Sequence, residues 1–388
     1  MHNKADPSEC NHDGVSPLFV ACKNNCIDIV KLLLEKNADT SQLTNDGVSP
    51  LFVACEYNCI DTGKLLLQYN ADPSLCNNEG KYPLYMACKN KSIEIVKLFL
   101  QYNADPSLCN NKGKSPLYVA CKKESIEIVR LLLENNPDVP HSINDQNERI
   151  IDTKIEILYS RQTRVLSTAC QQKNPDIAKL LVQHKADISR CNKNEESPLF
   201  VACQKCNIDI VKLLLQYDAD VSHCNNDGES PLYIACEGGY TDLVKLLLKN
   251  KADPSRCNNN GISPLFVAWQ EDNIDIVNLL LQYDVDVSHC NNDGESPLYI
   301  ACERGYTDLV KVLLQNKADI SQCNTNSQSS LYVACKECHK KIVSILLKNN
   351  ADISQCEKID GRSPLHVVCD IDLSDVFQFF HKTAVLKL

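Results

Sequence analysis

Residues 230–245 read SPLYIACEGGYTDLVK, and residues 296–311 read SPLYIACERGYTDLVK, so the two stretches differ only where Gly238 is replaced by Arg304. The same frame returns as SPLFVACKNNCIDIVK from Ser16 and as SPLFVACEYNCIDTGK from Ser49, which sets a period of 33 residues. A fixed period of this length indicates stacked copies of one small unit rather than a single globular core.

Eleven copies of the unit can be followed, and two steps break the period. Sixteen extra residues precede Arg164, and one extra residue precedes Ser363. The fifth copy is degenerate, because Arg164-Val165-Leu166 stands where Ser-Pro-Leu is expected. The copies start at Ser16, Ser49, Tyr82, Ser115, Arg164, Ser197, Ser230, Ser263, Ser296, Ser329 and Ser363.

The residues of one unit predict two short helices and a tight loop. Ser16 suits the N-cap of a first helix, and Pro17 suits its first position, where a missing N–H costs nothing. Residues 27–34 are apolar over more than one stripe, which predicts a second helix packed against both neighbours in a stack. Gly47 predicts a tight reversal, because glycine tolerates a positive φ. Eight glycines share this position: Gly14, Gly47, Gly80, Gly113, Gly228, Gly261, Gly294 and Gly361.

The Pro-Leu-x-x-Ala frame at this period resembles the ankyrin repeat, and the resemblance covers nearly the whole chain. It implies an all-α ankyrin-repeat solenoid of about eleven helix-turn-helix units with short hairpin fingers, in a cysteine-rich variant. Only Ser363-Pro364-Leu365-His366 keeps the family's histidine, and the other copies carry Phe or Tyr there, except for the degenerate fifth. Aromatic packing is therefore expected to replace the family's Thr–His hydrogen bond.

The breaks in the period divide the chain into three parts. We expect about four N-terminal repeats over residues 1–136, an insertion over residues 137–163, and about seven further repeats over residues 164–388, stacked as one continuous solenoid. The insertion is either a binding element or a decayed repeat. The first residues match the end of a unit, so the chain is expected either to be a fragment or to have its first helix pair covered by another segment.

Composition narrows the class of protein. The chain has 388 residues, and 44% of them are hydrophobic, which argues against disorder. No apolar run is long enough for a membrane span, and the first ten residues lack a signal peptide. The net charge of −10 argues against nucleic acid as the main partner. We expect a monomeric array in the cytoplasm.

The twenty-three cysteines fall mainly into two periodic series. Equivalent positions in stacked repeats lie roughly 8–10 Å apart, too far for a disulfide within either series. We therefore expect thiols in a reducing compartment. The helix series, expected to be buried, is Cys22, Cys55, Cys88, Cys121, Cys170, Cys203, Cys236, Cys302, Cys335 and Cys369. The finger series, expected to be partly exposed, is Cys10, Cys76, Cys109, Cys191, Cys224, Cys257, Cys290, Cys323 and Cys356.

Motifs for cofactors and catalysis have weak support. Cys335-Lys336-Glu337-Cys338-His339 matches the haem-attachment pattern, but Cys335 belongs to the buried helix series. The pair Cys203 and Cys206 lies four repeats from Cys335 and Cys338, too far away to share one zinc ion. Histidines recur without a nucleophile or acid beside them. We predict no cofactor, no metal, no catalytic residue and no enzyme activity.

The resemblance implies binding of a protein partner on a concave face built from fingers and first helices. Repeats three and four carry an excess of lysine there, and repeats seven to nine carry an excess of acid. A charge run can also be no more than a solvated face. The candidate contacts are Lys89, Lys91, Lys112, Lys114, Lys122, Lys123, Asp227, Glu237, Asp293 and Glu303, beside Lys81, Glu229, Glu271, Asp272 and Glu295.

The function implied by the resemblance is a scaffold or adaptor for protein–protein interaction. Two alternatives stay open at this stage. The array could be the targeting part of a longer enzyme, such as a ubiquitin ligase or kinase, whose catalytic domain lies outside this chain. The finger cysteines could instead serve a thiol-based redox or metal function.

Overall fold

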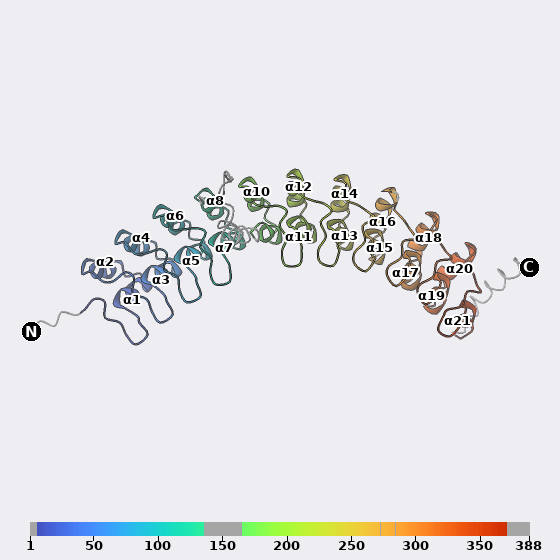
Figure 1. Ribbon diagram of the computed structural model, residues 1–388, viewed down its shortest axis with the longest axis horizontal. Coiled ribbons are helices and arrows are strands. Elements are labelled where there is room, and N and C mark those ends of the chain that lie inside the picture. Colours follow the sequence, from blue (N-terminus) through green and yellow to red (C-terminus); the bar gives the residue numbers. More distant parts are fainter. Residues whose placement is uncertain (1–5, 136–164, 272, 284, 371–388) are drawn as a thin grey trace, which may run out of the picture. The chain divides into compact units, whose positions relative to one another are not determined.

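The computed structural model describes residues 6–135, 165–271, 273–283 and 285–370. The chain forms two compact units, Met1–Asn192 and Lys193–Leu388. Each unit is a stack of helix pairs, and in the first unit α2, α4, α6 and α8 form one row while α1, α3, α5 and α7 form the other (Figure 1). Apart from one bridge between Cys323 and Ser329, every regular element of these residues is helical, which confirms the all-α prediction.

The first helices of the repeats are short and nearly equal in length. Most have seven residues, and residues 165–171 are also helical. They are α1 (Pro17–Lys23), α3 (Pro50–Glu56), α5 (Pro83–Lys89), α7 (Pro116–Lys122), α11 (Pro198–Gln204), α13 (Pro231–Glu237), α15 (Pro264–Gln270), α17 (Pro297–Arg304), α19 (Ser330–Lys336) and α21 (Pro364–Asp370).

The second helices are longer by one half-turn, with nine residues in most repeats. They are α2 (Ile27–Glu35), α4 (Ile60–Gln68), α6 (Ile93–Gln101), α8 (Ile126–Glu134), α10 (Pro175–Gln183), α12 (Ile208–Gln216), α14 (Thr241–Lys249), α16 (Ile274–Leu280) with the 3₁₀ helix η1 (Leu281–Tyr283), α18 (Thr307–Gln315) and α20 (Lys340–Lys348). None of the helices described is both long and apolar enough to cross a membrane.

The insertion at residues 137–163, the start of the fifth repeat at Arg164, Asp272 and the last segment from Val376 lie outside the described residues. The domain boundaries drawn from the sequence therefore stay predictions.

The predicted caps form as the sequence indicates. The Ser49 hydroxyl accepts a hydrogen bond from the backbone N–H of Phe52 at 3.1 Å, and Pro50 occupies the first turn of α3. In the eleventh repeat the Ser363 hydroxyl lies 2.8 Å from Nδ1 of His366. Where Phe or Tyr replaces that histidine, the ring is buried in most repeats, as with Phe52 at 2% exposed.

The loop between a second helix and the next first helix, here called the finger, is bonded to the finger before it. Nδ2 of Asn78 donates to the carbonyl oxygen of Asn45 at 3.1 Å, and Nδ2 of Asn111 donates to that of Asn78 at 3.1 Å. A backbone bond accompanies each link. The same links join Asn226, Asn259 and Asn292 in the second unit. We call these two rows of residues the asparagine ladders.

Burial separates the two cysteine series. Nine of the ten helix-series cysteines are buried, and the finger series is partly or fully exposed. Cys369 is the exception, because it is exposed near the end of the described residues. The expectation of burial was wrong for Cys369, since no described repeat follows to cover it. The buried members pack as small hydrophobes beside alanine.

Thiol reactivity is expected to follow this division. Burial raises the pKa of Cys22, Cys170 and Cys335 from 9.0 to about 12. This rise in pKa leaves about a thousandfold less thiolate at neutral pH. We expect iodoacetamide to alkylate the exposed Cys338 and Cys356 in the native protein and to spare the buried series, as read by peptide mass spectrometry. Native alkylation of Cys170 as fast as that of Cys356 would contradict this expectation, and guanidinium-unfolded protein provides the control.

Gly63 lies inside α4, where Val30 of the first repeat is fully buried. A Cβ added to Gly63 would meet no described atom within 4 Å, and Ala178 already occupies the equivalent position of the fifth repeat. We expect Gly63→Ala to raise the free energy of unfolding by about 1 kcal/mol, because glycine is a poor helix former. Chemical denaturation measures this gain. No gain from either Gly63→Ala or Gly63→Val would show that this site is already well packed.

Trp269 replaces the small cysteine of the other first helices. Its side chain is buried, at 1% exposed, and its indole N–H has no acceptor among the described residues. In the same repeat the second helix stops being α-helical at Leu280 and continues as η1. Trp269 is the largest fully buried side chain of the described residues, in a slot that cysteine fills in other repeats.

Candidate functional site

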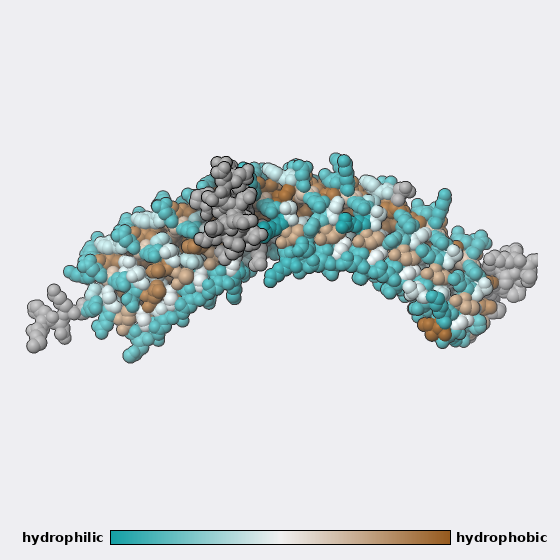
Figure 2. All heavy atoms as spheres, viewed as in Figure 1, coloured by the Kyte–Doolittle hydropathy of each residue, from teal (hydrophilic) through white to brown (hydrophobic). Residues whose placement is uncertain are grey.

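The candidate binding surface consists of the fingers and the exposed ends of the first helices. Figure 2 shows hydrophilic residues along the finger edge of each unit. The asparagine ladders fix the finger backbones, whereas the neighbouring side chains differ in charge from repeat to repeat. Rigid support beneath variable side chains is the arrangement expected of a binding surface.

The structure places the predicted basic contacts in repeats three and four of the first unit. Lys89 and Lys122 end α5 and α7, and Lys123 is the C-cap of α7. Lys91 follows α5 with a positive φ of 58°. All four side chains are exposed. They therefore lie at the exposed ends of the first helices, as predicted.

Lys112 and Lys114 lie instead on the wall of a cavity of about 460 Å³ between the third and fourth fingers, numbered here by the repeats into which they lead, at α5 and α7. Lys81, Glu79 and Tyr85 also line it. Glu79 forms an ion pair with Lys81. The hydrogen bond from Lys81, its charge and those of Lys112 and Lys89 lower the pKa of Glu79. This cavity is a half-open hollow in the basic surface.

The predicted acidic contacts of the second unit lie on repeats seven and nine. Asp227 and Asp293 are exposed at the finger turns. Their backbone carbonyls accept hydrogen bonds from the backbone N–H groups of Asn259 at 2.9 Å and Thr325 at 3.0 Å. The side chains of Asp227 and Asp293 therefore project from backbone that is hydrogen-bonded to the next finger.

Glu237 and Glu303 lie at the ends of first helices, each near other carboxylates. Burial and the charges of Glu229 and Glu271 raise the pKa of Glu237. Burial and Glu295 raise the pKa of Glu303, with Glu337 adding to the effect and Arg304 opposing it. The like charges make these two places favourable for a cationic partner.

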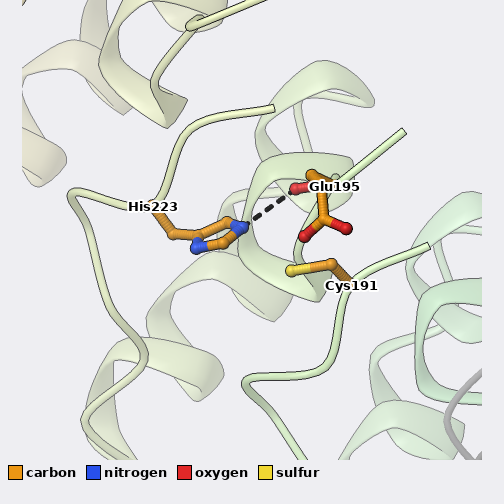
Figure 3. A group of neighbouring side chains, drawn as sticks. All are labelled: Cys191, Glu195 and His223. Carbon is orange, nitrogen blue, oxygen red and sulfur yellow. Dashed lines mark hydrogen bonds between the residues drawn. The ribbon is translucent and has the colours of Figure 1, made fainter. Parts of the chain in front are cut away.

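Histidines of the second unit contact neighbouring fingers. Nε2 of His223 lies 3.0 Å from the carbonyl oxygen of Glu195 (Figure 3). In the finger two repeats further on, Nε2 of His289 lies 3.1 Å from Sγ of Cys257. Cys257 and His289 together offer two ligand atoms, which is fewer than a zinc site needs. Cys335 of the haem-like motif is fully buried.

Sequence patterns alone do not identify Asn110, Tyr85 or Glu79, and they indicate Lys81 only as part of the lysine excess. A signal was present in the residue four positions after the finger asparagine. That residue is Glu229 after Asn225 and Glu295 after Asn291, but Lys114 after Asn110. The importance of this residue becomes clear only from the fold, which places its side chain beside the amide of the asparagine.

Comparison with known proteins agrees with this architecture. The model of the family "Ankyrin repeats (3 copies)" matches residues 1–75, 64–143, 150–223, 166–256, 217–289, 246–324 and 265–357. The chain is similar to the crystal structure of the ankyrin repeat domain of Bcl-3, described as a unique member of the IkappaB protein family. The two are 24% identical with a TM-score of 0.50, over 55% of this chain and 97% of that one. No curated protein sequence matches. The family matches span nearly all of the repeats, and the chain belongs to the ankyrin repeat family.

Proposed function

We propose that this chain is a protein-interaction scaffold or adaptor that binds its partner on the surface formed by the fingers and first helices. The observation that carries the proposal is a bonded, repeated framework beneath side chains of changing charge. Ankyrin repeats are in general modules for protein–protein interaction, and their fold is not catalytic. The predicted absence of enzyme activity is part of the proposal.

The place of action and assembly state are also proposed. Nine cysteines pack as small buried hydrophobes in the helices, a use of cysteine that fits a reducing cytoplasm. We further propose that the array works as a monomer. Light scattering on the reduced chain tests the monomer, and a larger mass would overturn it.

Site-specific photo-cross-linking tests the proposed surface. A photoreactive residue replaces Lys122 at the end of α7 or Glu237 at the end of α13, and the matched control replaces the exposed Lys97 on α6. The chains are exposed to reducing cell lysate with and without excess unlabelled chain. We expect the same proteins to be captured at Lys122 or Glu237 but not at Lys97, and to be displaced by the competitor. Equal capture at all three positions would contradict the proposal.

A further inference from the structure

The cavity between the third and fourth fingers has an unbalanced charge. Three lysines, Lys81, Lys112 and Lys114, line it with one carboxylate, Glu79, so the net charge of these four groups is +2 (3 − 1). Glu79 pairs with Lys81. Lys112 and Lys114 have no carboxylate within ion-pair distance among the described residues. The cavity is therefore electropositive before any ligand enters.

The asparagine at the cavity wall also has a donor to spare. Oδ1 of Asn110 accepts hydrogen bonds from the backbone N–H groups of Lys112 at 3.0 Å and Lys114 at 2.9 Å. Its side-chain NH₂ group has no acceptor among the residues described. Asn110 is only 8% exposed. An amide donor without a protein acceptor at a cavity wall can bond to a ligand that supplies one.

The second unit shows which acceptor fits. Asn225 makes the same two backbone bonds, and its Nδ2 donates to Oε2 of Glu229 at 2.9 Å. Asn291 does the same with Glu295, also at 2.9 Å. In these fingers the carboxylate comes from the residue four positions after the asparagine. In the fourth finger that residue is Lys114, which offers another donor.

We propose that this cavity binds an aspartate or glutamate side chain of an acidic peptide segment, whose carboxylate bonds to Asn110 Nδ2 and Lys114 Nζ. The incoming group takes the role that Glu229 and Glu295 fill in the second unit. Lys112 favours a second acidic residue beside the first. This inference rests on the proposed function, since it names the chemistry of a partner at part of the same surface.

The cavity suits a carboxylate-bearing peptide better than nucleic acid. Proteins that bind single-stranded DNA or RNA offer exposed aromatic rings on which the bases stack. Tyr85, the aromatic residue of the wall, is 8% exposed. Lys114 Nζ lies 5.5 Å from the centroid of the Tyr118 ring, a cation–π contact.

Fluorescence anisotropy on the full chain tests the proposal with a labelled poly-glutamate peptide. Poly-glutamine of the same length is the matched peptide, inorganic phosphate is the competitor for a free anion site, and single-stranded RNA is the alternative polymer. We expect poly-glutamate to bind, more weakly as salt rises, and poly-glutamine not to bind. Lys114→Glu supplies the carboxylate from the chain itself and should weaken binding at least about tenfold.

Folding is controlled within the same design. Lys114→Glu recreates a pair that already exists at Asn225 and Glu229, so circular dichroism should show a folded array. Lys112→Gln should weaken binding, and Lys64→Gln, on the exposed side of α4, should not. The inference would be overturned if poly-glutamate bound the wild type and Lys114→Glu equally. It would also be overturned if the chain bound RNA more tightly than poly-glutamate, or bound phosphate but not poly-glutamate. A partner cross-linked at Glu237 together with no poly-glutamate binding would overturn only this inference and leave the proposed function standing.

Discussion

Replacing Gly80 with alanine is expected to lower the free energy of unfolding of the first unit by about 3–4 kcal/mol. Gly80 has a φ of 69°, so alanine there costs about 1–2 kcal/mol from backbone strain alone. Its Cβ would also lie 2.8 Å from the backbone nitrogen of Asn111 and would overlap Oδ1 of the same residue. Asn111 would have to move, which breaks its two ladder bonds to Glu79 and Asn78, worth about 1 kcal/mol each.

Gly113 provides the matched control for Gly80. It has the same φ of 69°, but a Cβ added there meets no described atom within 4 Å. Gly113→Ala should therefore cost only the strain of about 1–2 kcal/mol. Hydrogen exchange read by mass spectrometry, together with urea denaturation, locates the loss in the third and fourth fingers. Equal destabilisation by the two variants would show that the ladder adds nothing to stability.

Phe52→Ala is expected to lower the free energy of unfolding by about 3–5 kcal/mol, the usual cost of emptying a buried phenylalanine site. Phe52 stands where the family has histidine, and it is 2% exposed. Its backbone N–H already donates to the Ser49 cap, so its ring contributes packing alone. A loss of this size would establish that aromatic packing has taken over the role of the family's Thr–His hydrogen bond.

Phe19→Ala serves as the control for Phe52→Ala. Phe19 holds the same position in the first repeat and bonds to the Ser16 cap in the same way, but its side chain is only partly buried. Phe19→Ala should lower the free energy of unfolding by less than half as much as Phe52→Ala, because folding buries less apolar surface at Phe19. Because stacked repeats can unfold in parts, hydrogen exchange is needed beside the denaturation curve. Similar losses at both positions would show that ring burial does not set the cost, and helix propensity could not explain them because alanine is the better helix former.

Much of the fold follows from local chemistry that the sequence displays. Ser49, Pro50 and Gly47 each have a residue type that matches one backbone requirement, so the helix start and the finger turn could be predicted. Other turns could not. Glu124 and Lys251 adopt a positive φ, although neither residue type favours it. Both complete a left-handed turn at a helix end, where the N–H of the next residue, Ser125 or Ala252, donates to the carbonyl oxygen of Ala120 or Leu247.

The candidate site was predictable only in part. Lys112 and Lys114 stand out as charges in variable positions, and the structure does place them on one cavity. Asn110 did not stand out, because asparagine at the finger reads as a turn residue. Its spare donor becomes visible only when its bonds are compared with those of Asn225. The failed expectation at Cys369 has a similar origin, since burial in a stack depends on the next repeat.

The asparagine ladders have a consequence for how such a gene can change. Each ladder asparagine donates backward through Nδ2 and accepts forward at its carbonyl oxygen, so any finger that carries it can follow any other such finger. Recombination that inserts or deletes whole periods therefore creates junctions with the correct donors and acceptors. Residues 216–236 and 282–302, which differ at one position, look like the product of such an event. Lengthening by copying then needs no newly selected interface, and later substitutions are free to alter the exposed charges alone.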